Sequence, residues 1–264
     1  MPEVYTHGHH ESVLRSHRWR TAENSAAYLL PRLDAGQRLL DVGCGPGNLT
    51  ADLASRVGSV VAIDNAPAAV AACSAELAER GVDNATVEVV DVYRLPYADD
   101  SFDVVHAHQV LQHLPDPVGA LVEMRRVCRP DGVVAVRDSD YPAMFWYPAD
   151  PRLDRWMALY LRIARSNSGE PAAARHLVAW CRAAGFSGIE PSGSAWVHAT
   201  PDDREYWGAM WADRVTESAL ADQALESGLA TRAELEEIAV AWRRWAADPD
   251  GWFTSTHGEV LGTP

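Results

Sequence analysis

Three glycines fall within five residues of the segment LLDVGCGPGNLTADLA, which spans residues 39–54. The apolar residues before the glycines suit a buried parallel strand, and the apolar residues after them recur at helical spacing. Gly43, Gly45 and Gly47 allow the backbone to turn sharply and allow a ligand to lie against bare main chain at the N-terminus of the helix. The segment therefore predicts a strand, a ligand-binding turn and a helix, in that order.

The residues on either side of the turn indicate the charge of the ligand. Asp41 would repel a diphosphate, but it suits a ligand that carries an ammonium and a sulfonium. The dinucleotide-binding pattern also requires a third glycine at the position that Asn48 occupies here. A Gly-x-Gly pattern alone is weak evidence, because many tight strand-to-helix turns contain glycine for steric reasons only. The acid before the turn and the missing third glycine together favour a cationic ligand.

Strands and helices are expected to alternate through the first half of the chain. Apolar runs predict strands over 39–42, 60–64, 86–91, 102–108 and 133–138, with helices over 67–80 and 117–129. A further helix is expected over 19–30, before the first strand. Strands that alternate with single helices require right-handed crossovers, so we expect an α/β fold with a doubly wound, mostly parallel sheet covered on both faces.

The composition changes after residue 140, and nine of the ten tryptophans lie between Trp146 and Trp252. The patterns predict a helix over 171–184, a sixth strand over 188–199 that Gly193 interrupts, and helices over 202–247. The segment 252–262 is expected to be extended.

Charge and cysteine content exclude several classes of function. The formal net charge of −14 disfavours binding to nucleic acid and to anionic membranes. The four cysteines form no Cys-x-x-Cys pair, which predicts neither a zinc cluster nor a disulfide framework and suits a reducing compartment. The N-terminus lacks the apolar core of a signal peptide, and no apolar run is long enough to span a bilayer. We therefore expect a cytoplasmic protein.

An aspartate ends each of the first three expected strands, at Asp41, Asp64 and Asp91. Ligands of open α/β sheets bind beyond the carboxyl ends of the strands. Asp64 follows Gly43 at close to the interval of roughly 20 residues at which an acid reaches the two hydroxyls of a ribose. Asp91 can accept from the exocyclic amine of a purine, and the Val92 N–H can serve the ring. One aspartate after a strand is as often a cap or a turn residue, but three beside a glycine loop indicate a nucleoside site.

These segments resemble the class I S-adenosylmethionine-dependent methyltransferases, and especially the small-molecule type that includes the quinone-biosynthesis C-methyltransferases. The matching residues are DVGCGPGNLT, AID, VVDVYRLPYADDSFDVVHAHQVLQHL and RPDGVVAV, between residues 39 and 138. The resemblance implies S-adenosyl-L-methionine as cofactor, S-adenosyl-L-homocysteine as product and a small-molecule methyl acceptor. It also implies a seven-stranded sheet whose last strand, over 252–262, is antiparallel and lies at the sheet edge.

The resemblance also assigns cofactor contacts to residues of this sequence. The implied contacts are Asp41, Gly43 and Gly45 for the methionine portion, Asp64 and Asn65 for the ribose, Asp91 and Val92 for the adenine, and His108 and Gln109 beside the methionine end. Tyr5 stands where many relatives have an N-terminal aromatic residue over the methionine carboxylate.

The predicted organisation is a single methyltransferase domain over residues 1–264. Residues 1–34 form an N-terminal helical lid segment, and residues 35–200 with 251–264 form a Rossmann-like core. Residues 201–250 form a helical insertion, or lid, before the last strand. The sequence leaves the oligomeric state open, with a homodimer as one option.

Methyl transfer from a sulfonium disperses positive charge, so the protein contributes mainly by positioning the reactants and excluding water. An acceptor hydroxyl or activated carbon also requires a proton acceptor. His113 is the first candidate for this base, although a turn role before the helix at Pro117 explains it equally well. Asp138, Asp140 and Tyr141, just after the fifth strand, are second candidates with the same structural alternative.

Two clusters have a functional and a structural interpretation. The first cluster consists of His7, His9 and His10. It could ligate a metal, but no acids or cysteines lie near it at ligand spacing, so no metal is predicted. The second cluster consists of Trp146, Trp207 and Trp211. These residues could line an acceptor pocket, although helical stripes of aromatic residues usually belong to the hydrophobic core.

Two other functions remain open at this point. An NAD-dependent oxidoreductase on a related sheet would need the third glycine and, in its common short-chain form, a Tyr-x-x-x-Lys motif, which the chain lacks. A protein that binds the cofactor without turnover is the second alternative.

Overall fold

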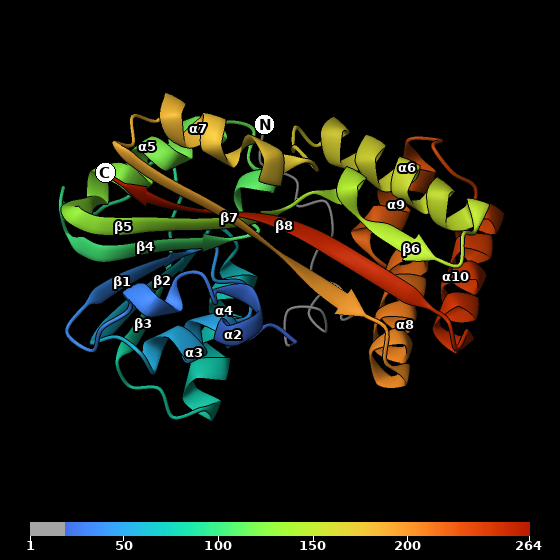
Figure 1. The fold of residues 1–264 in the computed structure, drawn as a ribbon, viewed down its shortest axis with the longest axis horizontal. Coiled ribbons are helices and arrows are strands. Elements are labelled where there is room, and N and C mark those ends of the chain that lie inside the picture. The colour runs from blue at the N-terminus through green and yellow to red at the C-terminus, as the bar shows by residue number, and fades with distance from the viewer. Residues whose placement is uncertain (1–18) are drawn as a thin grey trace.

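A two-stranded antiparallel ribbon runs through the molecule and joins its two halves (Figure 1). The ribbon consists of β7 (Gly188–His198) and β8 (Trp252–Thr263). At one end it belongs to the central sheet, and at the other it lies beside a group of helices (Figure 1). The structure is a computed structural model and describes residues 19–264.

The central sheet has eight strands in the order β3-β2-β1-β4-β5-β8-β6, and β7 pairs with β8. The first five strands in this order are parallel to one another, whereas β8 is antiparallel to β5, β6 and β7. The remaining strands are β1 (Arg38–Val42), β2 (Ser59–Asp64), β3 (Ala85–Val89), β4 (Phe102–His108), β5 (Cys128–Ser139) and β6 (Phe145–Tyr147). The expected α/β fold with a doubly wound, mostly parallel sheet is confirmed.

The sheet contains the seven expected strands and one more, β6, which pairs with the first residues of β8. Two expectations about the last strands were wrong. The last strand does not lie at the edge: its second half lies between β5 and β7. Gly193 does not interrupt β7, since it pairs with Gly258 in a continuous ladder. A Cβ at Gly193 would lie 3.1 Å from the His257 carbonyl oxygen, so this glycine allows a close approach of the two strands.

Helices cover both faces of the sheet because strand side chains alternate between two apolar clusters. Leu39 faces α3 (Asn48–Ala54) and α4 (Pro67–Glu79), and Leu40 faces α5 (Pro117–Val127) and α7 (Leu177–Ala183). The helix α4 ends as predicted just before Gly81, whose φ of +68° lies in the left-handed region.

The predicted helix over 19–30 was wrong in extent. Only α2 (Ala22–Ser25) and the 3-10 turn η1 (Leu30–Arg32) form there. Thr21 and Asn24 close a capping box around the short α2. The apolar residues of the segment are nevertheless buried against the sheet. Of the residues predicted to line one helical face, Ala22 and Ala26 are buried and Leu30 is partly buried, because the backbone leaves the helical conformation after one turn.

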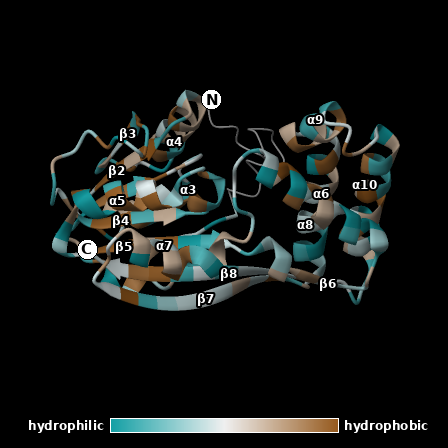
Figure 2. Ribbon diagram, turned by 90° about the horizontal axis from the view of Figure 1, so that it is seen from above, coloured by the Kyte–Doolittle hydropathy of each residue, from teal (hydrophilic) through white to brown (hydrophobic). Residues whose placement is uncertain are grey.

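The second half of the molecule contains a helical body (Figure 2). Its helices are α6 (Pro151–Ser166), α8 (Pro201–Glu217), α9 (Ala219–Glu226) and α10 (Arg232–Ala247). They share one apolar cluster with the first residues of β8. The helical pattern predicted over 202–247 thus forms three helices, and α6, which was not predicted, completes the same core. No helix within residues 19–264 is long and apolar enough to cross a membrane.

Trp156 is the centre of the helical body, and its replacement should destabilise the fold. Its buried ring lies 4.6 Å from the ring of Trp211 and 4.9 Å from that of Trp242. Trp156→Ala leaves a cavity, and we expect it to lower the free energy of unfolding by about 3–5 kcal/mol. Urea unfolding followed by circular dichroism measures this change. Trp252→Ala, at a side chain that is 45% exposed, is the matched control. Equal losses in the two variants would contradict this account of the core.

Candidate functional site

The loops that carry most of the predicted site residues meet at one edge of the sheet. Parallel pairing aligns Val42 of β1 with Ile63 of β2 and with Ala107 of β4. His108 at the end of β4 pairs with Arg137 of β5. Because the carboxyl ends of parallel strands lie at the same edge, the loops that follow them form one continuous surface.

The glycine loop has the conformation that the sequence predicted. Gly43, Gly45 and Gly47 have φ values of +71°, +53° and +90°, which side chains strongly disfavour. A Cβ at Gly47 would lie 2.9 Å from the Cα of Cys73, so α4 also approaches too closely for a side chain there. The N–H groups of Gly43 and Cys44 donate to the carbonyl of Ile63, which ties the loop to the end of β2.

Asp64 is bound to the glycine loop. Its Oδ2 accepts from the Gly45 N–H at 3.1 Å, and its Oδ1 accepts from the Ala66 N–H at 3.0 Å. The carboxylate is half-buried and its orientation is fixed, and each oxygen keeps a lone pair for a further donor. This arrangement can bind a pair of neighbouring hydroxyls.

The other predicted nucleoside contacts lie in the loops after β2 and β3. Asn65 is exposed. Asp91 is exposed and accepts from the Tyr93 N–H, two residues beyond the observed end of β3 at Val89. Val92 is buried beside it. The predicted strand was therefore two residues too long, and the roles of these residues stay predictions.

Asp41 is only 3% exposed and is already engaged by protein groups. Its Oδ2 accepts from the Thr50 hydroxyl at 2.6 Å, and its Oδ1 lies 2.9 Å from His106 Nδ1. The carboxylate therefore connects β1 with α3 and β4. Its contact with a ligand ammonium stays a prediction.

Gln109 connects four segments at the end of β4. Its Oε1 accepts from Arg20 Nη2 at 2.7 Å, and its Nε2 donates to Ser139 Oγ at 3.0 Å and lies 3.1 Å from His257 Nε2. Its φ of +55° is rare for a residue with a side chain, and such strain is typical of functional sites. Sequence reasoning missed Arg20, Ser139 and His257, because no local motif links positions so far apart.

His108, the last residue of β4 and the one before Gln109, is almost completely buried. Burial and the nearby Arg20 and Arg137 guanidinium groups hold the pKa of His108 well below its usual range. Burial and Arg137 lower the pKa of His257 in the same way. Both rings are therefore neutral at pH 7. Within residues 19–264 both ring nitrogens of His108 are buried and neither has a hydrogen-bond partner.

Gln112 contacts both His113, the first candidate for the catalytic base, and Asp138, one of the second candidates. It belongs to the 3-10 turn η2 (Leu111–His113), and its N–H donates to Asp138 Oδ1 at 3.0 Å. Its Nε2 lies 3.0 Å from Nε2 of His113. Burial, followed by Arg20, lowers the pKa of His113 to about 3, and burial raises the pKa of Asp138 to about 8. At pH 7 the imidazole is neutral and weakly basic, and the carboxyl is mostly protonated.

Asp140 and Tyr141 make contacts that connect β5 with its surroundings. Both oxygens of Asp140 accept from Arg175, at 2.6 and 2.7 Å. Tyr141, in the turn η3 (Tyr141–Ala143), stacks on Tyr160 of α6 at 3.9 Å between ring centroids. These contacts support the structural interpretation of both residues.

The three tryptophans predicted as pocket residues belong to the helical body. Trp207 and Trp211 are buried in its core, and Trp146 packs against it. The ring of Trp207 stacks on His198 at 4.1 Å between centroids. These positions fit the core interpretation, and an acceptor contact stays a prediction.

Tyr5 and the cluster of His7, His9 and His10 lie outside the described residues. In the part of the chain that the structure does describe, no three His, Cys, Asp or Glu side chains gather as metal ligands. The expectation that the protein uses no metal stays a prediction.

Comparison with known proteins gives one consistent family. The model of the family described as "Methyltransferase domain" matches residues 33–199. An uncharacterised methyltransferase of Schizosaccharomyces pombe is 32% identical, over 97% of this chain and 95% of its own length. The ubiquinone/menaquinone biosynthesis C-methyltransferase UbiE of Bdellovibrio bacteriovorus is 39% identical, over 39% of this chain and 44% of its own length.

A solved structure shows the same fold. Phosphoethanolamine N-methyltransferase 2 of Haemonchus contortus, in complex with phosphomonomethylethanolamine and S-adenosylhomocysteine, superposes with a TM-score of 0.54 at 19% sequence identity. The match covers 89% of this chain and 52% of that one.

The raised pKa of Asp138 should make the stability of the protein depend on pH. The Asp138 carboxyl holds its proton more tightly in the folded protein than in the unfolded chain. The free energy of unfolding therefore falls as the pH rises from about 4 to the folded pKa of about 8. Asp138→Asn removes this loss and can still accept from the Gln112 N–H. We expect the variant to gain about 2–4 kcal/mol over the wild type between pH 5 and pH 8.

Urea unfolding at the two pH values measures this gain. Asp83→Asn, at an exposed position after α4, is the control and should show no such difference. A gain for Asp138→Asn that is the same at both pH values would show that the carboxyl is ionised in the folded protein.

Proposed function

The chain belongs to the methyltransferase domain family, and on that premise we propose that it transfers a methyl group to a small organic acceptor by direct displacement. It is an S-adenosyl-L-methionine-dependent methyltransferase, and S-adenosyl-L-homocysteine is its product. The acceptor class and the roles of individual residues are our proposal.

The observation that carries the proposal is the bond between the Gly45 N–H and the Asp64 carboxylate. It fixes an acid with free lone pairs beside a loop of left-handed glycines, at the carboxyl edge of a parallel sheet. The close approach of Cys73 to Gly47 excludes a side chain at that position of the loop. These features fit a nucleoside with a positively charged amino-acid tail.

Each part of the cofactor has matching residues in this chain. We assign Asp64 and Asn65 to the ribose, Asp91 and Val92 to the adenine, Asp41, Gly43 and Gly45 to the methionine portion, and His108 and Gln109 to the end beside it. When bound, the cofactor supplies an electrophilic methyl group on a sulfonium.

The rest of the site positions the acceptor and excludes water. Gln109 and Arg20 connect the segment before α2 to the sheet edge, and Trp196 Nε1 donates to the Asn24 carbonyl at 2.6 Å. These contacts hold the residues around α2 over the ends of β4 and β5. Orientation and the exclusion of water supply up to about 7–11 kcal/mol in well-aligned reactions, so a strong base is not required.

A small acceptor fits the charge of the protein, since a net charge of −14 disfavours nucleic acid. The similarity to UbiE supports an organic molecule of low mass as acceptor. A cofactor-binding protein without turnover remains the alternative. The short-chain oxidoreductase alternative has no support in the family that the chain matches.

Removal of the Asp64 carboxylate should weaken cofactor binding. The carboxylate forms charge-assisted bonds that are worth about 1.5–3 kcal/mol each, so Asp64→Ala should raise the Kd for S-adenosylhomocysteine at least about tenfold. Isothermal titration calorimetry measures this Kd. Asp83→Ala, which removes an exposed aspartate after α4, should leave it unchanged. An unchanged Kd in Asp64→Ala would remove the basis of the site.

His113 should affect turnover without affecting cofactor affinity. With a pKa of about 3 it is neutral from pH 5 to pH 8, so no loss of rate in this range comes from its protonation. We expect His113→Gln to lower kcat at least about tenfold with the best acceptor of a panel, if the ring accepts the proton. The Kd for S-adenosylhomocysteine should stay within about twofold of the wild type. A normal kcat in this variant would assign His113 to the turn before α5.

A further inference from the structure

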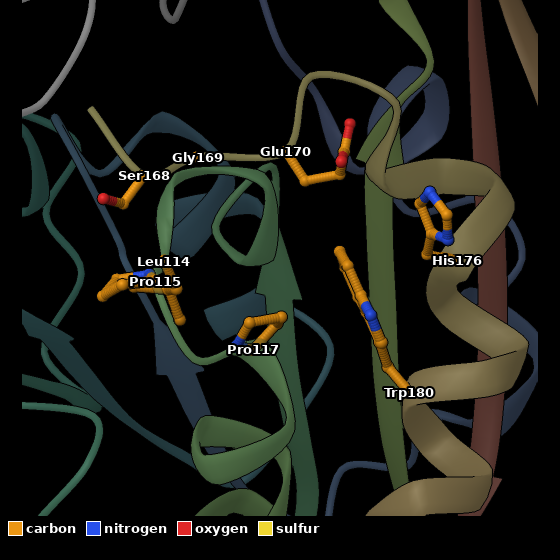
Figure 3. Close-up of a pocket in the computed structure, with 8 residues that line it drawn as sticks. All are labelled: Leu114, Pro115, Pro117, Ser168, Gly169, Glu170, His176 and Trp180. Carbon is orange, nitrogen blue, oxygen red and sulfur yellow. The ribbon is translucent and has the colours of Figure 1, made fainter. Parts of the chain in front are cut away.

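A pocket separate from the candidate active site opens beside the start of α5 (Figure 3). Its volume of about 310 Å³ suits one small organic molecule. The lining includes the apolar residues Leu114, Pro115, Pro117 and Trp180 and the polar residues Ser168 and Glu170. These residues come from the loop after η2, from the start of α5, from the loop after α6 and from α7. None of them was assigned to cofactor or catalysis.

An aromatic ring forms one wall of this pocket. Figure 3 shows the Trp180 ring edge-on, with one face toward Pro117 and the other toward His176. The ring of His176, in η4 (Ala173–His176), stacks on Trp180 at 5.5 Å and 22° and supports it from behind. The face of Trp180 that is turned toward the prolines is therefore presented to an occupant.

A carboxylate provides the charge of the pocket. Glu170 Oε1 accepts from the Ala172 N–H at 2.9 Å, which fixes the side chain. Within residues 19–264 Glu170 forms no ion pair, and the nearby Arg175 is held by both oxygens of Asp140. Arg175 and Glu170 still attract one another, but the guanidinium is already occupied. The negative charge of Glu170, which lines the same pocket as Trp180, is therefore left for another cation.

We propose that this pocket binds a small organic cation, with an alkylated ammonium group between the face of Trp180 and the carboxylate of Glu170. A cation on an indole face is attracted by the ring quadrupole, and an apolar wall favours alkyl groups over bare ammonium. The proline rings opposite Trp180 provide such a wall. The net charge of −14 also raises the local concentration of cations.

The pocket contacts the segment that carries the candidate base. Leu114 and Pro115 directly follow His113, and the Glu170 N–H donates to the Gln112 carbonyl at 2.9 Å. The pocket lies in the layer of α5 and α7, whereas the glycine loop leads into α3 on the other face of the sheet. The two ligands therefore occupy separate sites that share the loop after β4.

The first test compares a cation with its neutral isostere. Choline and 3,3-dimethylbutan-1-ol have the same shape and differ by the charge, and both are titrated into the full chain saturated with S-adenosylhomocysteine. Saturation-transfer NMR or calorimetry gives the two Kd values. We expect choline to bind at least about threefold more tightly, since a cation–π contact contributes about 0.5–2 kcal/mol. Equal affinities, or no choline binding at millimolar concentrations, would overturn the proposal.

The second test removes each half of the proposed contact. Glu170→Gln keeps the shape of the side chain, and Trp180→Leu keeps an apolar wall. Each should weaken choline binding about threefold or more, whereas Glu236→Gln, on the exposed side of α10, should not change it. All three variants should bind S-adenosylhomocysteine like the wild type, which separates this site from the cofactor site. Choline binding that is unchanged in both pocket variants would show that the cation binds elsewhere.

Discussion

The close approach of α4 to the glycine loop is the constraint on which the site depends. The Cα of Cys73 leaves no room for a Cβ at Gly47, and the left-handed backbone of the loop disfavours side chains as well. The Gly45 N–H in the same loop donates to the Asp64 carboxylate, and α3 begins directly after Gly47. The Thr50 hydroxyl of α3 then reaches Asp41. The tight glycine loop thus brings α3 and two of the three acids, Asp41 and Asp64, together at one edge of the sheet.

A second feature of this edge is a layer of buried polar groups on β4, β5 and β8. Arg137 and Glu259 pair across β5 and β8 at 3.1 Å while both are buried, and Ser194 of β7 bonds to each of them. A buried ion pair gives little net stability, because desolvation offsets much of the attraction. Its effect here is electrostatic, since the Arg137 charge adds to burial, the larger cause, in lowering the pKa of the neighbouring His108 and His257. The layer keeps these rings neutral beside the expected methyl group, where a neutral ring does not repel a sulfonium.

The sequence predicted those parts of the fold that local patterns encode. The strand runs, the glycines and the acids at strand ends sit within short segments, so β1 to β5 and the positions of Asp64 and Asp91 could be inferred. Gln109 could be placed at the edge, but its partner Arg20 is 89 residues away and His257 is 148 residues away, and no periodicity records such pairs. The place of β8 inside the sheet depends in the same way on distant strands. By contrast, α6 had a readable signal in its apolar residues at helical spacing, which are buried as expected for such a pattern.

The β7–β8 ribbon limits how the helical body can act as a lid. Its ladder is continuous from Gly188 with Thr263, in the sheet, to His198 with Phe253, in the core of the helical body. A hinge that separated the two halves would have to break backbone hydrogen bonds of this ladder or bend both strands together. The segment around α2 is held less extensively, by side-chain contacts such as Arg20 with Gln109 and Trp196 with Asn24. Since loss of a few such bonds costs less than disruption of a strand pair, we expect access to the acceptor site to be controlled by the segment around α2, with the helical body as a fixed wall.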